Sequence, residues 1–147
     1  AQRQLPVTRA PPLTLPSVMA VKTDQDDQTV YDLSVALPSG PNWFSLVFTE
    51  TRDDLQFELG GVQRAVMTNR WGSLKGKKVI QISGIDGQRS IALKLIQQRN
   101  KPITGYVVAG HYGLPATLMD WSQGRGETAV ASRTGDHTLT YAPFKLQ

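Results

Sequence analysis

The chain has 147 residues, a net charge of +4, thirteen glycines, nine prolines and no cysteine. This length suits one domain that buries its apolar surface without disulfides or metal ions, and the glycine and proline content favours β structure with many turns. The missing cysteine excludes a disulfide framework, a thiolate nucleophile and a cysteine-based zinc site. No apolar run approaches the length of a membrane span, so we expect none.

The first twenty residues contain four of the nine prolines. Proline disrupts a helix and interrupts a sheet ladder, so residues 1–20 are predicted to form an extended N-terminal arm, partly in the polyproline II conformation. The β domain is predicted to cover residues 21–147. The apolar residues of the arm are expected to grip a groove on the same domain or on a neighbour; they are Leu5, Val7, Leu13, Leu15 and Val18.

After an acidic loop at 23–28, apolar residues alternate with polar ones along most of the chain, as in half-buried strands. Segment 90–100 is compatible with a strand or a helix, and its β neighbours favour a strand. Segment 113–121 is predicted to include one helical turn. The predicted strands lie at about 31–37, 44–48, 55–59, 62–67, 79–83, 90–100, 103–110, 126–133 and 138–146.

These eight or nine short strands, with turn signals every 8–12 residues, predict an all-β fold. We expect a single antiparallel β-sandwich of jelly-roll or Greek-key type, with a closed barrel as the alternative. The extended proline-rich arm precedes it.

Charge is divided unevenly along the chain. Residues 1–58 carry a net charge of −4, residues 59–101 carry +8, and residues 102–147 are neutral. One interpretation is that the fold mixes these blocks and the surface averages out. The other is a positive and a negative face, which favour head-to-tail self-association or an anionic partner.

The most basic stretch surrounds one aromatic residue, Trp71, and contains no acid. Three interpretations are open for it: a solvated strand edge and turn, a patch that contacts another protein or subunit, and a nucleic-acid contact. No RRM or KH signature accompanies it. The basic residues are Arg64, Arg70, Lys75, Lys77 and Lys78.

Catalytic candidates are few. His111 and His137 lie 26 positions apart without companions at metal-ligand spacing. A Ser122–His111–Asp120 triad lacks a nucleophile-elbow motif. The carboxylate pairs at 26–27 and 53–54 read as solvated turns. We therefore predict no catalytic residue, no metal, no cofactor and no enzymatic activity.

Trp43, Trp71 and Trp121 are candidates for a sugar-binding face. Trp43 alternates with the apolar Phe44 and Phe48, so it is a candidate for exposure.

The sequence favours a structural or assembly protein, such as a virion shell, decoration or pilus-like subunit. It is expected to act through the arm and complementary charged faces, as a homo-oligomer or in a larger assembly. The alternatives are a binding module for carbohydrate or an acidic ligand, and a nucleic-acid-contacting protein that uses residues 64–78. The start at Ala1 fits removal of an initiator Met or of a signal peptide. A virion, extracellular or periplasmic location is the expectation.

Overall fold

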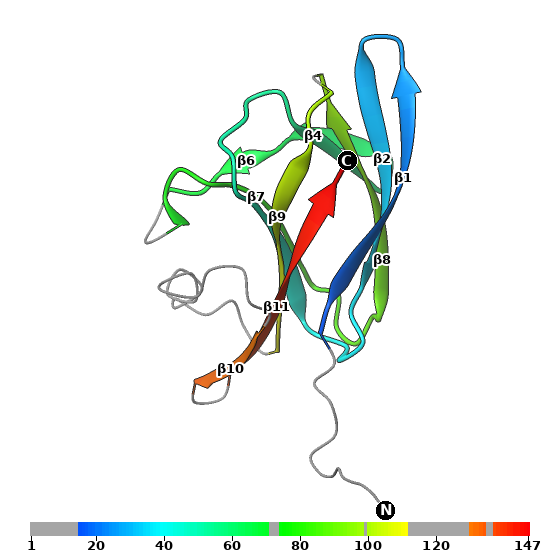
Figure 1. The fold of residues 1–147 in the computed structure, drawn as a ribbon. Helices are drawn as coiled ribbons and strands as arrows, with labels where there is room; N and C mark the ends of the chain where they lie inside the picture. The colour runs from blue at the N-terminus through cyan, green and yellow to red at the C-terminus, as the bar shows by residue number, and fades with distance from the viewer. Residues whose placement is uncertain (1–14, 71–73, 99, 112–129, 135–136) are drawn as a thin grey trace, which may run out of the picture.

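The computed structural model describes residues 15–70, 74–98, 100–111, 130–134 and 137–147. In this part of the chain the regular elements are strands, arranged in two antiparallel sheets (Figure 1). The predicted all-β sandwich is confirmed, while its jelly-roll or Greek-key subtype stays a prediction. None of the described residues forms a helix with the length and hydropathy needed to cross a bilayer.

Sheet A has five strands among the described residues, and sheet B has six. In spatial order, sheet A contains β1 (Ser17–Gln25), β2 (Gln28–Ala36), β8 (Ser90–Gln97), β4 (Gln56–Leu59) and β5 (Val62–Ala65). Sheet B contains β10 (Val130–Thr134), β11 (His137–Leu146), β9 (Ile103–His111), β3 (Trp43–Phe48), β7 (Lys78–Ser83) and β6 (Met67–Thr68). Within the ambiguous segment 90–100, residues 90–97 therefore form a strand, as the β neighbours favoured, and the predicted helical turn at 113–121 lies outside the described residues.

The main core lies between the two sheets and follows the alternation of the sequence. Leu33 and Val35 of β2 face Phe44 and Leu46 of β3, and all four side chains are buried. At one end Phe48 meets the ring of Phe144 edge-on, with the ring centroids 5.9 Å apart. Such a core stabilises the sandwich through removal of apolar surface from water.

Sheet B is also buried on its outer face, because every residue of β3 is buried there. A second apolar cluster includes Trp43, Val108 and Tyr141. The expected exposure of Trp43 is wrong: its side chain is 1% exposed. The physical reason is that alternation identifies the two faces of a strand but not what covers each face.

The N-terminal boundary of the sandwich lies before the predicted one. β1 begins at Ser17 and pairs with β2 along its whole length, so residues 17–20 belong to sheet A. Val18 of the predicted arm packs on the main core, and Leu15 is half-buried. Leu5, Val7 and Leu13 lie outside the described residues.

Candidate functional site: a groove between the sheet edges

A groove of about 870 Å³ opens between the sheets where β5 ends sheet A and β6 ends sheet B. This side of the sandwich lies opposite β1 (Figure 1). The volume lies within the range of ligand-binding pockets. The lining comes from β4 and β5 (Phe57, Leu59, Val62, Arg64 and Ala65), from residues 67–70, and from residues 79–83 of β7.

The apolar side of the groove is formed by the β4–β5 hairpin, which extends past the edge of sheet B; this extension is called the overhang. Across this hairpin Phe57 pairs with Arg64 and Leu59 pairs with Val62, so these four side chains share one face. Phe57 and Leu59 pack against the main core, whereas Val62 is 50% exposed. The inner face of sheet A therefore extends beyond the part that sheet B covers. This extended part forms the groove together with Ile80 and Ile82 of β7.

The overhang follows from the short span of β6. Val66 alone separates β5 from β6, so the chain passes from one sheet to the other within one buried residue. β6 then pairs with only Val79 and Lys78 of β7. Beyond this point, no described strand covers the outer edge of β7.

Two strand edges in the groove present backbone groups that the described sheets do not pair. The Asn69 N–H donates to the Lys77 carbonyl at 2.8 Å, so the backbone groups of Lys77 point towards β6. Alternate residues of an antiparallel strand point the same way, which directs Gln81 and Ser83 to the open edge. On β5, the Val66 N–H donates to the Leu55 carbonyl at 3.1 Å, so the backbone groups of Val66 point towards β4. The same alternation directs the backbone groups of Gln63 and Ala65 away from β4.

Arg64 and Arg70 are the charged residues of the groove lining, and both are exposed. Within the described part of the chain, that lining contains no Asp or Glu. Among the described residues neither guanidinium forms an ion pair. The groove thus combines an apolar floor with positive groups, an arrangement that suits a ligand with apolar and anionic parts.

The rest of the predicted basic patch does not act with these two arginines. Lys77 Nζ donates to the Thr49 carbonyl at 3.2 Å. Lys78 is buried, and its Nζ lies 3.3 Å from the Asp53 carboxylate. Lys75 is exposed but does not line the groove, and Trp71 lies outside the described residues. The structure thus brings Arg64 and Arg70 together at one site and holds Lys77 and Lys78 against the 49–53 loop.

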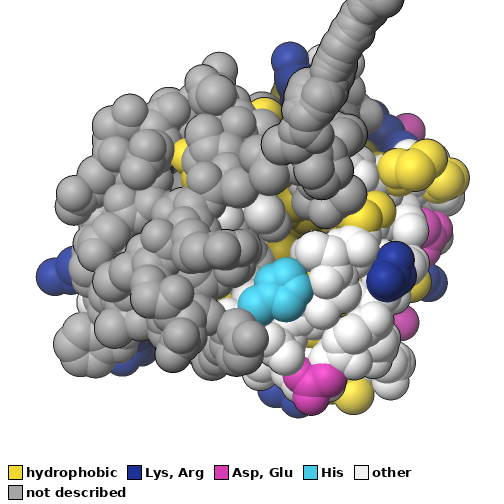
Figure 2. All heavy atoms as spheres, turned by 90° about the horizontal axis from the view of Figure 1, so that it is seen from below, with side chains coloured by type: hydrophobic (Ala, Val, Ile, Leu, Met, Phe, Trp, Pro, Cys, Tyr) yellow, Lys and Arg dark blue, Asp and Glu magenta, His cyan; other side chains and the backbone are white. Residues whose placement is uncertain are grey.

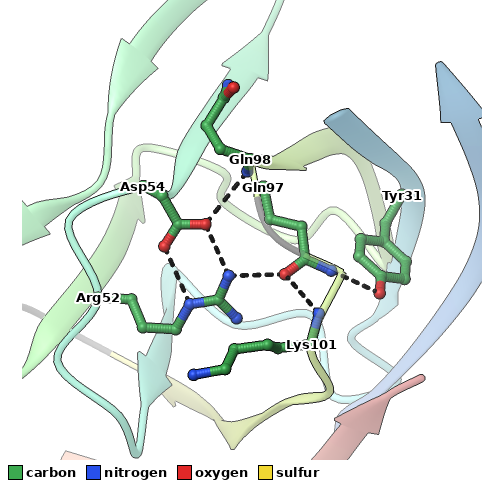
Figure 3. A network of polar contacts seen from close by, with 6 residues as sticks. All are labelled: Tyr31, Arg52, Asp54, Gln97, Gln98 and Lys101. Carbon is green, nitrogen blue, oxygen red and sulfur yellow. Dashed lines mark hydrogen bonds and ion pairs between the residues drawn. The ribbon is translucent and has the colours of Figure 1, made fainter. Parts of the chain in front are cut away.

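A buried polar network lies at one end of the sandwich (Figure 3). The Arg52 guanidinium donates to both carboxylate oxygens of Asp54, at 3.0 and 2.6 Å, and to Gln97 Oε1 at 2.7 Å. The Gln97 amide donates to the Tyr31 hydroxyl at 3.0 Å, and Gln98 N–H donates to Asp54 at 3.1 Å. Burial raises the pKa of Tyr31, and the Gln97 hydrogen bond opposes that shift. This network joins the 52–54 loop to β2 and β8.

The network corrects the prediction that residues 52–54 form a solvated turn. Arg52 is buried and the Asp54 side chain is 12% exposed, whereas Asp53 beside it is open to water. The paired carboxylates at 26–27, by contrast, are both exposed as expected. Sequence alone did not separate the two pairs, because Arg52 donates to Gln97 and Asp54 accepts from the Gln98 N–H, and both partners lie far along the chain.

The described histidine side chain shows no catalytic setting. His111 Nε2 donates to the Ser39 carbonyl at 3.0 Å, which assigns the proton to that nitrogen. On the face of the molecule seen in Figure 2, apolar, acidic and basic side chains are mixed among the coloured residues. No group of three or more potential metal ligands occurs among the described residues. Ser122, Asp120 and Trp121 lie outside the described residues, and the side chain of His137 is not described.

Comparison of the chain with protein-family models, curated proteins and solved structures finds no match. The site therefore has to be interpreted from its own chemistry. Sequence reasoning identified Arg64 and Arg70 but missed the groove between them. A usable signal was present: Arg64 alternates with Val62 and Val66, and an arginine on an apolar strand face indicates that the face is not fully covered.

Proposed function

We propose that this protein is a non-enzymatic assembly protein whose working surface is the groove, and that the groove takes an extended segment of another polypeptide. The observation that carries this proposal is the combination of an apolar floor with backbone groups on β7 that no described strand pairs. A small apolar ligand uses the floor alone, whereas a polypeptide in extended conformation also uses the N–H and C=O groups of Gln81 and Ser83. Strand addition of this kind is a common mode of peptide recognition.

The chemistry of the segment follows from the lining. Alternate side chains of an added strand point to opposite faces, so every second residue enters the groove. Apolar side chains at these positions contact Phe57 and Leu59 on one side and Ile82 on the other. A carboxylate near the rim accepts hydrogen bonds from Arg64 or Arg70, in charge-assisted contacts that are stronger than neutral ones.

Charge favours an acidic segment over the N-terminal arm. Residues 1–18 contain Arg3 and Arg9 and no acid, so an arm of this composition brings positive charge to a groove that already holds two arginines. Arm exchange, the mechanism that the sequence suggested, is therefore less favourable than docking of an acidic strand.

The proposal is tested by titration of the isotope-labelled protein with a capped nine-residue peptide of alternating Val and Asp, followed by backbone NMR. Chemical-shift changes are expected at residues of β5 and β7, and a matched peptide of alternating Val and Lys should leave them unchanged. The Arg64→Glu, Arg70→Glu double variant should lose the response. Lys75→Glu should retain it, because this exposed residue does not line the groove.

Two outcomes contradict the proposal. Equal responses to the acidic and basic peptides would show that charge at the groove has no role in recognition. A response to single-stranded DNA at the groove, with none to either peptide, would assign the arginines to nucleic-acid binding instead.

A further inference from the structure

The most exposed large hydrophobic side chains lie at two opposite edges of the sandwich. Among the described residues these side chains are Met19 and Val21 on β1, 71% and 67% exposed, and Val62 and Met67 in the groove, 50% and 67% exposed. β1 and β5 are the two edge strands of sheet A. Exposed apolar side chains that gather at particular edges, rather than scatter, indicate interaction surfaces.

The two edges carry opposite charge. The β1–β2 hairpin projects beyond the neighbouring strands (Figure 1) and holds four exposed acids, Asp24, Asp26, Asp27 and Asp32, against the single base Lys22. The groove holds Arg64 and Arg70, and none of the described residues that line it is an acid. The edge at β1 thus offers what the groove accepts: an extended strand with exposed apolar side chains, next to a turn and a strand that carry three of the four acids.

We propose that the segment bound in the groove is β1 of a second copy of this chain, so that copies join head to tail. This inference rests on the groove function proposed above and names its partner. β1 keeps its pairing with β2 in its own copy and uses its other edge, which no described strand pairs. Met19 and Val21 become covered at the contact, and the acids of the hairpin approach Arg64 and Arg70. Each heterologous contact of this kind uses the groove of one copy and the β1 edge of the next, so assembly continues into chains or closes into rings.

The charge arrangement gives a test by exchange. One variant reverses the groove (Arg64→Glu with Arg70→Glu), and the other reverses the hairpin edge (Asp27→Lys with Asp32→Lys). These positions are exposed, and Asp26 is left unchanged because its φ of +47° restricts the residue that replaces it. Glu50→Lys and Lys75→Glu serve as controls, since both residues are exposed and neither belongs to β1, β2 or the groove.

Sedimentation velocity of the full chain over a concentration series should show a mass that rises with concentration. Each reversed variant alone should associate at least about tenfold more weakly, because like charges then meet at the contact. An equimolar mixture of the two should regain association, since every groove then meets an edge of opposite charge. The controls should behave as the unaltered chain does.

The outcomes separate this inference from the function on which it rests. If the acidic peptide binds the groove but the chain remains a monomer at its highest soluble concentration, the groove function stands and the partner is a different protein. If the chain assembles and the mixture of reversed variants associates no better than either alone, head-to-tail contact is wrong. If the peptide does not bind and assembly ignores the groove variants, both proposals fail.

Discussion

The adjacent residues Asp53 and Asp54 each form an ion pair, but the two pairs differ in their exposure to water. Neutralising each aspartate in turn therefore tests the polar network at the end of the sandwich. Asp54 receives two hydrogen bonds from Arg52, and both side chains are largely buried, at 12% and 6% exposed. Asp53 pairs with Lys78 at 3.3 Å, but its own side chain is 96% exposed. We expect Asp54→Asn to destabilise the protein strongly and Asp53→Asn to have little effect.

The expected size follows from burial. Removal of one partner of a buried ion pair leaves an uncompensated buried charge and costs about 3–5 kcal/mol. The amide introduced by Asp54→Asn would also place its NH₂ group beside one of the guanidinium N–H groups of Arg52, so a donor then faces a donor. For a chain of this length, such a loss lowers the melting temperature by roughly 6–20 °C. The exposed Asp53 carboxylate is solvated and screened, so its loss should leave the unfolding midpoint close to that of the unaltered chain.

The assay is equilibrium urea unfolding of the unaltered chain and both variants. With a slope of about 2 kcal/mol per molar urea, the Asp54→Asn midpoint should fall by roughly 1.5–2.5 M. Similar, small shifts for the two variants would refute the reasoning, because the Arg52–Asp54 pair would then be as solvated as the Asp53–Lys78 pair. An unchanged slope is needed for the comparison, since it shows that both variants unfold from an equally compact state.

Two further predictions concern packing and pH. A Cβ at Gly110 would overlap the Trp43 ring, so Gly110→Ala should lower the urea-unfolding free energy by about 1–3 kcal/mol. An unchanged midpoint would show that the ring has room to move. Burial raises the pKa of Tyr31 above 10.0, so this tyrosine ionises in the unfolded chain at a lower pH than in the folded one. The contribution of Tyr31 to the free energy of unfolding is therefore constant below about pH 10 and should fall as the pH rises above it. Tyr31→Phe should weaken this fall in urea midpoints measured across that range, and an equal fall in both proteins would contradict the assignment.

Much of the fold could be predicted from alternation, because one face of each strand meets the core. Leu33 and Val35, or Phe44 and Leu46, repeat with period two and are buried together as that pattern requires. The ambiguous segment 90–97 also followed its alternation, with Leu93 and Leu95 in the core. Period two is a property of the strand itself, so it can be read without knowledge of the neighbouring strands.

The features that alternation missed all depend on contacts between distant segments. Trp43 is buried because a second cluster covers the outer face of sheet B. Asp54 is largely buried because Arg52 and the Gln98 N–H both donate to it, and Gln97 holds Arg52 in place. The groove exists because β6 ends after two residues, and beyond it no described strand pairs with the outer edge of β7. Each of these depends on sheet order, which residue spacing within one strand does not encode.

The groove leaves a sheet edge of an isolated sandwich open to unwanted pairing with other chains, and this liability is itself an argument for a partner. Proteins protect exposed sheet edges with charge, proline, bulges or covering loops, because an open edge pairs with other chains. Here the groove edge has arginines that repel a second groove, and the β1 edge has acids that repel a second β1 edge. Such an arrangement disfavours contact between like edges but does not oppose contact between unlike edges. If the edges needed only protection against pairing with other chains, the same charge on both edges would serve equally well. The two edges instead carry opposite charges and exposed apolar side chains, which favours pairing of one edge with the other; these side chains are Met19, Val21, Val62 and Met67.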